Sequence, residues 1–234
     1  MAASSAKRII DAARKHGQRT LSEYDSKRVL KAYGVPVTRE ILVATQAAAR
    51  DAARKLGYPV VLKACSADAI HKTEKGLVAV GLGTDRELGQ AFRTLKRRAG
   101  TGYHGDFLVQ EMVRGEREIM IGMIRDDQFG PSVMFGLGGI FTEILEDVVF
   151  RVAPLTKRDA REMTRAIRGH RILDAIRGMK AVDLDVLTRC LIGIGRLGLD
   201  FPEIREIDIN PLIVRGARPI AVDGLVVLDA PEPG

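Results

Sequence analysis

The sequence predicts an α/β or α+β protein, in which short apolar strands alternate with amphipathic helices along 234 residues. The composition, with 46% hydrophobic and 29% charged residues, is that of a folded protein that can bury its own core. Apolar patterns with a period of two and of 3.6 residues follow one another repeatedly. From Phe107 onward strands predominate, which places a boundary between two lobes near Met112–Gly115.

Helices are expected where apolar residues recur at helical spacing behind a capping residue. The segment SEYD at residues 22–25 fits a capping box, and the GVP at 34–36 ends that helix. The expected helices are Ala6–His16, Ser22–Tyr33, Gln46–Leu56, Arg86–Ala99, Lys157–Gly169 and Asp183–Leu197.

Strands are expected where short apolar or alternating runs are bounded by Gly, Pro or polar residues. Val148–Phe150 also favours a strand. The other expected strands are Glu40–Val43, Val60–Ala64, Leu77–Leu82, Phe107–Met112, Glu118–Ile124, Ser132–Leu137, Ile204–Val214 and Pro219–Val222.

Charge and composition exclude several classes of protein. The 37 Lys and Arg outnumber the 30 Asp and Glu, but the two signs are interleaved, there is no Trp, and aromatics are 5% of residues, so we expect no nucleic-acid partner. No stretch approaches the roughly 20 apolar residues of a membrane span. The N-terminal residues lack the apolar core of a signal peptide. Cys65 and Cys190 lie far apart with no CxxC, which favours a reducing cytoplasm over a disulfide framework or a structural zinc site.

The segment EIDINP at residues 206–211 is the most informative motif. On a strand, Glu206, Asp208 and Asn210 share one face while Ile207 and Ile209 share the other. Asp223 follows the next short strand. Such carboxylate and amide oxygens suit a Mg²⁺–nucleotide site, although a solvent-facing strand edge fits the periodicity as well.

Four further features could bind parts of a nucleotide, but each is less specific than the EIDINP motif. Lys63 interrupts an apolar strand, where it either meets an anion such as phosphate or protects an edge strand from aggregation. Backbone groups of Glu111 and Val113 at a strand end could bind an adenine edge, and the Glu118 carboxylate a ribose. The glycines Gly136, Gly138 and Gly139 fit either a phosphate cradle or a tight turn.

His71 lies in a polar segment between two expected strands. An imidazole there could carry a phosphoryl group, because it is nucleophilic and close to half-protonated at neutral pH. The alternative is a solvated loop histidine.

Five segments, taken in order, resemble a known family. They are PVVLKA (59–64), AIHKTEKGLV (69–78), LVQEMVRGERE (108–118), FGPSVMFGLGGIFTEILEDVVFRVAPL (129–155) and EIDINPLIV (206–214). The set is similar to the ATP-grasp β subunit of ADP-forming (NDP-forming) acyl-CoA synthetases such as acetate–CoA ligase, and more distantly to the succinyl-CoA synthetase β subunit. The resemblance runs from about Leu21 to Asp229.

The resemblance implies an ATP-grasp fold whose two lobes clamp ADP or ATP. It implies a helical lead at 1–22, a small lobe with a phosphohistidine loop at 23–112, and a large lobe at 113–234. The implied roles are phosphate binding by Lys63, adenine binding by Glu111 and Val113, ribose binding by Glu118, Mg²⁺ binding by Asn210 and Asp223 with Asp208 beside them, a phosphate cradle at Gly136, Gly138 and Gly139, and a phosphohistidine at His71.

The resemblance also implies an acid–thiol ligase that works with a separate CoA-binding α subunit, in an α2β2-type assembly. The phosphoryl group would pass from an acyl phosphate to an α-subunit histidine, then to His71, then to ADP. Two features depart from the family pattern: Lys75 stands where a glycine is usual, and nothing resembles a CoA-binding domain, so we expect no acyl-CoA synthesis by this chain alone. The alternatives are a regulatory ATP-grasp module and an ATP-grasp ligase that uses an acyl phosphate without phosphohistidine.

Overall fold

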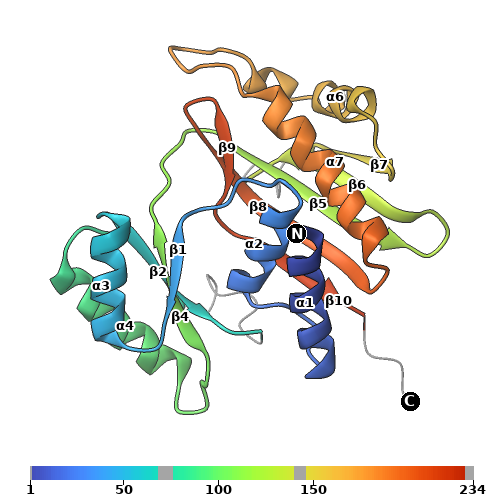
Figure 1. Cartoon of the computed structure of the whole chain (residues 1–234). Helices are drawn as coiled ribbons and strands as arrows, with labels where there is room; N and C mark the ends of the chain where they lie inside the picture. Colours follow the sequence, from blue (N-terminus) through green and yellow to red (C-terminus); the bar gives the residue numbers. More distant parts are fainter. Residues whose placement is uncertain (1, 68–75, 140–145, 230–234) are drawn as a thin grey trace. The chain divides into compact units, whose positions relative to one another are not determined.

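A computed structural model of the chain describes residues 2–67, 76–139 and 146–229. Helices and strands are mixed along the chain, with several strands in succession, and the strands of both sheets pair antiparallel, so the α+β form of the predicted fold class is confirmed (Figure 1). The chain separates into two compact units: unit 1 comprises residues 1–21, 25–37 and 113–234, and unit 2 comprises residues 22–24 and 38–112. None of the described helices is long and apolar enough to cross a membrane.

Unit 2 is a four-stranded sheet in the order β1-β4-β2-β3, covered by two helices. Its strands are β1 (Glu40–Val43), β2 (Val60–Cys65), β3 (Val78–Leu82) and β4 (Asp106–Glu111), and its helices are α3 (Gln46–Leu56) and α4 (Asp85–Ala99). The hydroxyls of Thr45 and Thr84 accept from the Ala48 and Glu87 amides and so cap the two helices. Small residues of α3 and larger apolar residues of α4 complete one core with β2 and β4.

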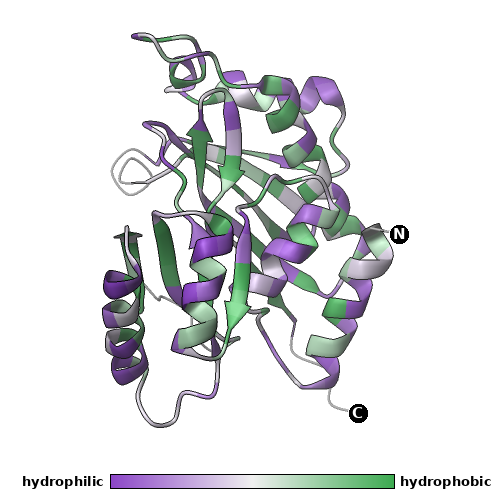
Figure 2. Ribbon diagram, turned by 60° about the vertical axis from the view of Figure 1, so that its left-hand side comes forward, coloured by the Kyte–Doolittle hydropathy of each residue, from purple (hydrophilic) through white to green (hydrophobic). Residues whose placement is uncertain are grey.

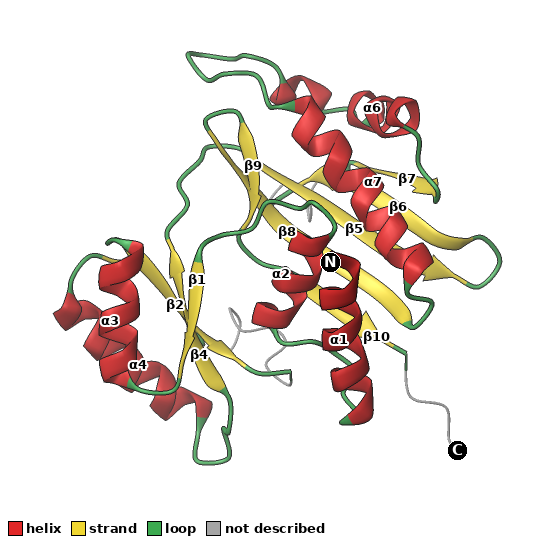
Figure 3. Ribbon diagram, viewed as in Figure 1, coloured by secondary structure: helices red, strands yellow, loops and turns green. Residues whose placement is uncertain are grey.

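Unit 1 contains a six-stranded sheet in the order β10-β8-β5-β6-β7, with β9 paired to β8 (Figure 3). Its strands are β5 (Glu118–Asp126), β6 (Gly130–Leu137), β7 (Val148–Val152), β8 (Ile204–Arg215), β9 (Arg218–Ala221) and β10 (Leu225–Leu228). Its helices are α1 (Ala2–Lys15), α2 (Glu23–Ala32, whose first two residues belong to unit 2), α6 (Lys157–Ala166), α7 (Leu184–Asp200) and the 3-10 helix His170–Leu173.

One hydrophobic core joins the helices of unit 1 to one face of this sheet. Ile119, Ile121 and Met123 of β5 and Ile207 and Ile209 of β8 point into it. The helices are amphipathic, with hydrophobic and hydrophilic residues alternating along each ribbon (Figure 2). Side chains at the intervening strand positions therefore lie on the opposite face, which we call the outer face.

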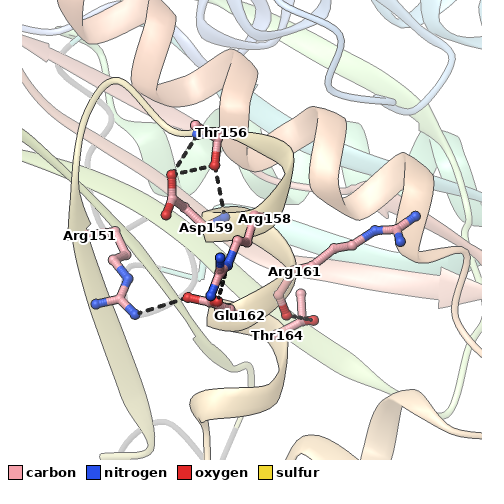
Figure 4. Close-up of polar contacts among 7 residues, drawn as sticks. All are labelled: Arg151, Thr156, Arg158, Asp159, Arg161, Glu162 and Thr164. Carbon is pink, nitrogen blue, oxygen red and sulfur yellow. Dashed lines mark hydrogen bonds and ion pairs between the residues drawn. The ribbon is translucent and has the colours of Figure 1, made fainter.

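The start of α6 shows how local chemistry fixes an element. Thr156 and Asp159 form a reciprocal capping box, in which the Thr156 amide donates to the Asp159 carboxylate at 2.8 Å and the Asp159 amide donates to the Thr156 hydroxyl at 3.1 Å (Figure 4). The Thr156 hydroxyl, which donates to the Asp159 carboxylate at 2.6 Å, and then the Thr156 amide lower the pKa of Asp159. On the exposed side of the helix, Arg158 donates to Glu162 at 2.8 Å.

Several boundaries differ from the prediction. The expected helix ending at Gly169 stops at Ala166, because the buried Asp147 accepts hydrogen bonds from the Arg168 and Gly169 amides, each at 2.7 Å, and turns the chain. The sequence analysis did not foresee β10, a four-residue strand that pairs with β8. Such a short run directly after Gly224 is hard to distinguish from a loop.

Candidate functional site

Predicted site residues from different strands lie on the outer face of the unit 1 sheet. Asp208 and Asn210 alternate with the buried Ile207 and Ile209 along β8, as the period of two predicted. On the neighbouring strand, Glu118 alternates with the buried Ile119. The register therefore gives one face of the sheet polar groups from β5 and β8, and the opposite face the hydrophobic core.

Three carboxylates come together on this face. Burial, and then the negative charges of Glu206 and Asp223, raise the pKa of Asp208 from 3.8 to about 6. Asp223 follows β9 and accepts from the Gly224 amide at 2.8 Å through its own Oδ1, which holds its carboxylate at the turn into β10. The groups that shift the Asp208 pKa are thus acids, so the cluster is a place where a cation would relieve repulsion.

Asn210 is placed beside this cluster by a β-bulge. Ile119 pairs with Leu212 and Ile121 with Ile209, so Asn210 and Pro211 together lie opposite Met120. A bulge is where a strand tolerates proline, which has no amide hydrogen for the ladder. The Pro211 carbonyl accepts from the Val222 amide at 3.2 Å, which ties the bulge to the segment that carries Asp223.

The oxygens of Asp208, Asp223 and Asn210 fit Mg²⁺ as a ligand set. Among the described residues, no group of three or more His, Cys, Asp and Glu side chains could hold a metal ion. Magnesium bound with nucleotides usually takes one or two carboxylates and completes its shell with phosphate and water. The donor set therefore suits a metal that arrives with phosphate.

The glycine-rich turn after β6 packs against Glu118. The Gly138 amide donates to the Glu118 carbonyl at 2.9 Å, and a Cβ on Gly138 would lie 2.9 Å from the backbone of Glu118 and Ile119. Gly139 has φ of +63°, and a Cβ there would overlap the Glu118 carboxylate. Close packing against Glu118 therefore explains why residues 138 and 139 are glycines. The Gly138 amide already donates a hydrogen bond within the protein. Gly136, within β6, pairs with Met120 and Val148.

Lys63 in unit 2 meets an anion, but that anion is a protein carboxylate. Its Nζ donates to Glu23 Oε1 at 2.8 Å, and the side chains of Lys63 and Glu23 are only 7% and 1% exposed. Since β2 lies between β4 and β3, the edge-strand interpretation of Lys63 is wrong. Sequence reasoning missed Glu23, because its capping-box position gave it a local role and no pattern links it to a residue 40 positions away.

Glu111 ends β4, and its side chain is held by Arg39. The carboxylate accepts from the Arg39 amide at 2.9 Å, from Nε at 3.2 Å and from Nη2 at 3.1 Å, while the Glu111 amide donates to the Arg39 carbonyl at 2.9 Å. This paired contact fixes the end of the strand where a purine edge is predicted to bind. Val113 is the first residue of its segment of unit 1 and is buried. His71 lies outside the described residues.

Comparison with known proteins places the chain in a family. A model of the ATP-grasp domain matches residues 12–228. The chain is 44% identical over 230 residues to the ADP-forming acetate–CoA ligase I subunit beta of Pyrococcus furiosus, covering 96% of this chain and 98% of that one.

Solved structures agree. An acetyl-coenzyme A synthetase 1 of Candidatus Korarchaeum cryptofilum, in complex with coenzyme A and calcium-AMPCP, superposes with a TM-score of 0.91 at 37% identity over 96% of this chain and 100% of that chain. A second structure of that enzyme, with Mg-AMPPCP and its phosphohistidine segment pointing towards the nucleotide-binding site, matches over the same shares at 37% identity with a TM-score of 0.84. The chain has the ATP-grasp fold and belongs to the family of ADP-forming acetate–CoA ligase β subunits.

Proposed function

We propose that this chain is the nucleotide-binding β subunit of an ADP-forming acyl-CoA synthetase, an acid–thiol ligase. With a CoA-binding α subunit, in an α2β2-type assembly, it would interconvert acyl-CoA, ADP and phosphate with carboxylic acid, ATP and CoA. The observation that carries the proposal is the acid cluster on the outer face, where burial and then the neighbouring carboxylates Glu206 and Asp223 raise the pKa of Asp208 to about 6. The full-length similarity to a relative named as a β subunit supports the subunit role and a separate partner.

Asp208, Asp223 and Asn210 would hold Mg²⁺. Bound there, the ion would neutralise the phosphate oxygens of the nucleotide. The protein's own part is to fix these oxygens on two adjoining segments of unit 1, with Asn210 positioned by the bulge. Binding would also offset the repulsion from Glu206 and Asp223, which after burial raises the pKa of Asp208.

The remaining nucleotide contacts follow from the family resemblance. Glu118 would accept from ribose hydroxyls, and the backbone of Glu111 and Val113 would bind the adenine edge. Lys63 would contact a phosphate oxygen while keeping Glu23, since an ammonium group has three donor hydrogens. At least two of these residues, Glu111 and Lys63, are immobilised by ion pairs within the protein. Such preorganisation is what phosphoryl transfer requires of the protein.

His71 would carry the phosphoryl group between the two subunits. In the ATP-forming direction, the phosphorus–nitrogen bond to the imidazole would break and a phosphorus–oxygen bond to the β-phosphate of ADP would form. The electron pair of the broken bond would stay on the ring nitrogen, and with a proton on the other ring nitrogen His71 would leave as neutral imidazole. The acyl substrate would bind the partner. We place the reaction in the cytoplasm, where the free, buried Cys65 and Cys190 would remain reduced.

Two measurements test this function. Calorimetric titration of the chain with Mg-ADP should show binding, and a chain that takes up no Mg-ADP would instead fit a regulatory module. In the complex reconstituted with the partner subunit, γ-³²P-ATP should give an acid-labile, base-stable phosphoprotein. His71→Ala should abolish that label and net turnover, whereas His16→Ala, at the exposed end of α1, should keep both. Full turnover by the His71 variant would refute the relay.

A further inference from the structure

Arg117, the residue before β5, is a buried cation bound by backbone oxygens. Its side chain lies in unit 1, and the residue is 3% exposed. Nη1 donates to the carbonyls of Ile172 and Asp174, each at 3.1 Å, and Nη2 donates to those of Lys180 at 2.6 Å and Gly216 at 3.1 Å. In the part of the chain that the structure describes, no ion pair joins Arg117 to an acid.

These four carbonyls belong to segments that have little regular structure of their own. Ile172 and Asp174 lie in and after the 3-10 helix, Lys180 lies before α7, and Gly216 forms the turn between β8 and β9. Only a planar guanidinium can donate to so many acceptors at once. Arg117 is therefore the point at which these segments are tied to the start of β5.

The start of β5 also carries Glu118, and hydrogen bonds hold the backbone of both residues. The Arg117 carbonyl accepts from the Val214 amide at 3.0 Å, and the Glu118 carbonyl accepts from the Gly138 amide at 2.9 Å. Because side chains alternate along a strand, Arg117 points into the core side while Glu118 points to the outer face. The Arg117 side chain thus anchors the start of β5 from the core side of the sheet, and the Glu118 carboxylate lies on the outer face at the same end of the strand.

We propose that Arg117 is a positioning residue for nucleotide binding. By tying the start of β5 to the four carbonyls, it holds Glu118 where its carboxylate can accept from the ribose. This inference rests on the proposed function, because it takes Mg-ADP as the ligand.

Arg125, at the other end of β5, provides a matched control. Its Nε donates to the Ile204 carbonyl at 2.9 Å, and its Nη2 donates to those of Gly198 at 2.5 Å and Phe201 at 3.1 Å. The chemistry is the same, a guanidinium bound by backbone carbonyls on the core side of the strand. No residue assigned to the nucleotide is adjacent to it in β5.

The test compares Arg117→Lys with Arg125→Lys in the full chain. Each change keeps the charge but loses carbonyl contacts, so both should lower the melting temperature. Only Arg117→Lys should weaken Mg-ADP binding, by about tenfold or more, as loss of an orienting contact typically does. A Kd within twofold of that of Arg125→Lys would overturn the inference and leave the proposed function standing. No Mg-ADP binding by the unchanged chain would overturn the proposed function, and the inference with it.

If Arg117→Lys does not fold, hydrogen exchange of the unchanged chain tests whether Arg117 is a positioning residue. Coupling between two sites is reciprocal, so a ligand held by Glu118 should in turn stabilise the segments tied to Arg117. The Val182 and Asp183 amides, which donate to Leu173 and Ala217 at 2.8 Å, should exchange more slowly with Mg-ADP. The Phe201 amide near Arg125 should not. Unchanged exchange at Val182 and Asp183 would overturn the inference.

Discussion

Replacing Asp208 by Asn should stabilise the metal-free chain at neutral pH, although it removes a predicted metal ligand. The carboxylate is partly buried on β8 and faces the charges of Glu206 and Asp223. Its pKa rises from 3.8 to about 6, first because of burial and then because of these two acids. An amide of nearly the same shape keeps the packing and removes the charge.

The sign and size of the effect follow from the linkage between protonation and folding. A carboxyl whose pKa is higher in the folded state favours unfolding when it is ionised. The cost is absent below about pH 4, where Asp208 is protonated in both states, and is complete above about pH 6. At roughly 1.4 kcal/mol per pKa unit, the rise gives a limit of about 3 kcal/mol.

Denaturant unfolding in a chelator, at intervals from pH 4 to pH 8, measures this cost. The free energy of unfolding of Asp208→Asn should exceed that of the unchanged chain by up to about 3 kcal/mol at pH 8, and the difference should vanish near pH 4. Asp126→Asn is the control, because amides of Gln128 and Phe129 lower the pKa of Asp126 and that variant should gain no stability at high pH. A lower or pH-independent stability of Asp208→Asn would refute the reasoning.

Mg-ADP should stabilise Asp208→Asn less than it stabilises the unchanged chain. Mg-ADP should raise the melting temperature of the unchanged chain, since ligand that binds only the folded state stabilises it. For Asp208→Asn that rise should be much smaller. A stable variant with weak binding is the exchange of stability for function expected of a site that holds repelling charges.

Two further changes test the contacts of Lys63 and Gly139. Lys63→Met should lower the free energy of unfolding by about 3–5 kcal/mol, because it removes the Lys63 ammonium from the buried Glu23 carboxylate. Denaturant unfolding measures this loss, and Glu23→Gln added to Lys63→Met should recover part of it. Gly139→Ala should weaken Mg-ADP binding, measured by calorimetry, because its Cβ would displace the Glu118 carboxylate. Gly17→Ala has nearly the same φ, +68°, but no neighbour within 4 Å, so an equal loss of binding there would show that backbone strain, rather than Glu118, is responsible.

Local periodicity accounts for what could be predicted from the sequence. The helix Gln46–Leu56 and the strand Glu40–Val43 have the expected bounds, because caps and alternation are properties of neighbouring residues. The same holds for Asp208 and Asn210, whose common face requires only that residues 206–210 form a strand.

Contacts between distant segments could not be predicted in this way. The sequence analysis grouped Asp223 with Asp208 and Asn210, but the approach of Asp223 to Asp208 depends on the turn from β9 to β10, which no local pattern defines. Nor does any pattern pair Lys63 with Glu23 or bring four carbonyls to Arg117. These contacts depend on strand register and on turns that only the folded chain defines.

The distant contacts also change the charge balance of the predicted site. From the sequence, Lys63 offers a free positive charge for phosphate and the acids offer a place for a metal. In the structure the Lys63 ammonium already has the Glu23 carboxylate at 2.8 Å, whereas the neighbours that shift the Asp208 pKa are acids. Bound Mg²⁺ would add positive charge beside Asp208, whose pKa is raised by burial and by two acids, whereas metal-free ADP would add negative charge. We therefore expect ADP to bind together with its magnesium, and ADP binding that does not depend on magnesium would refute this reasoning.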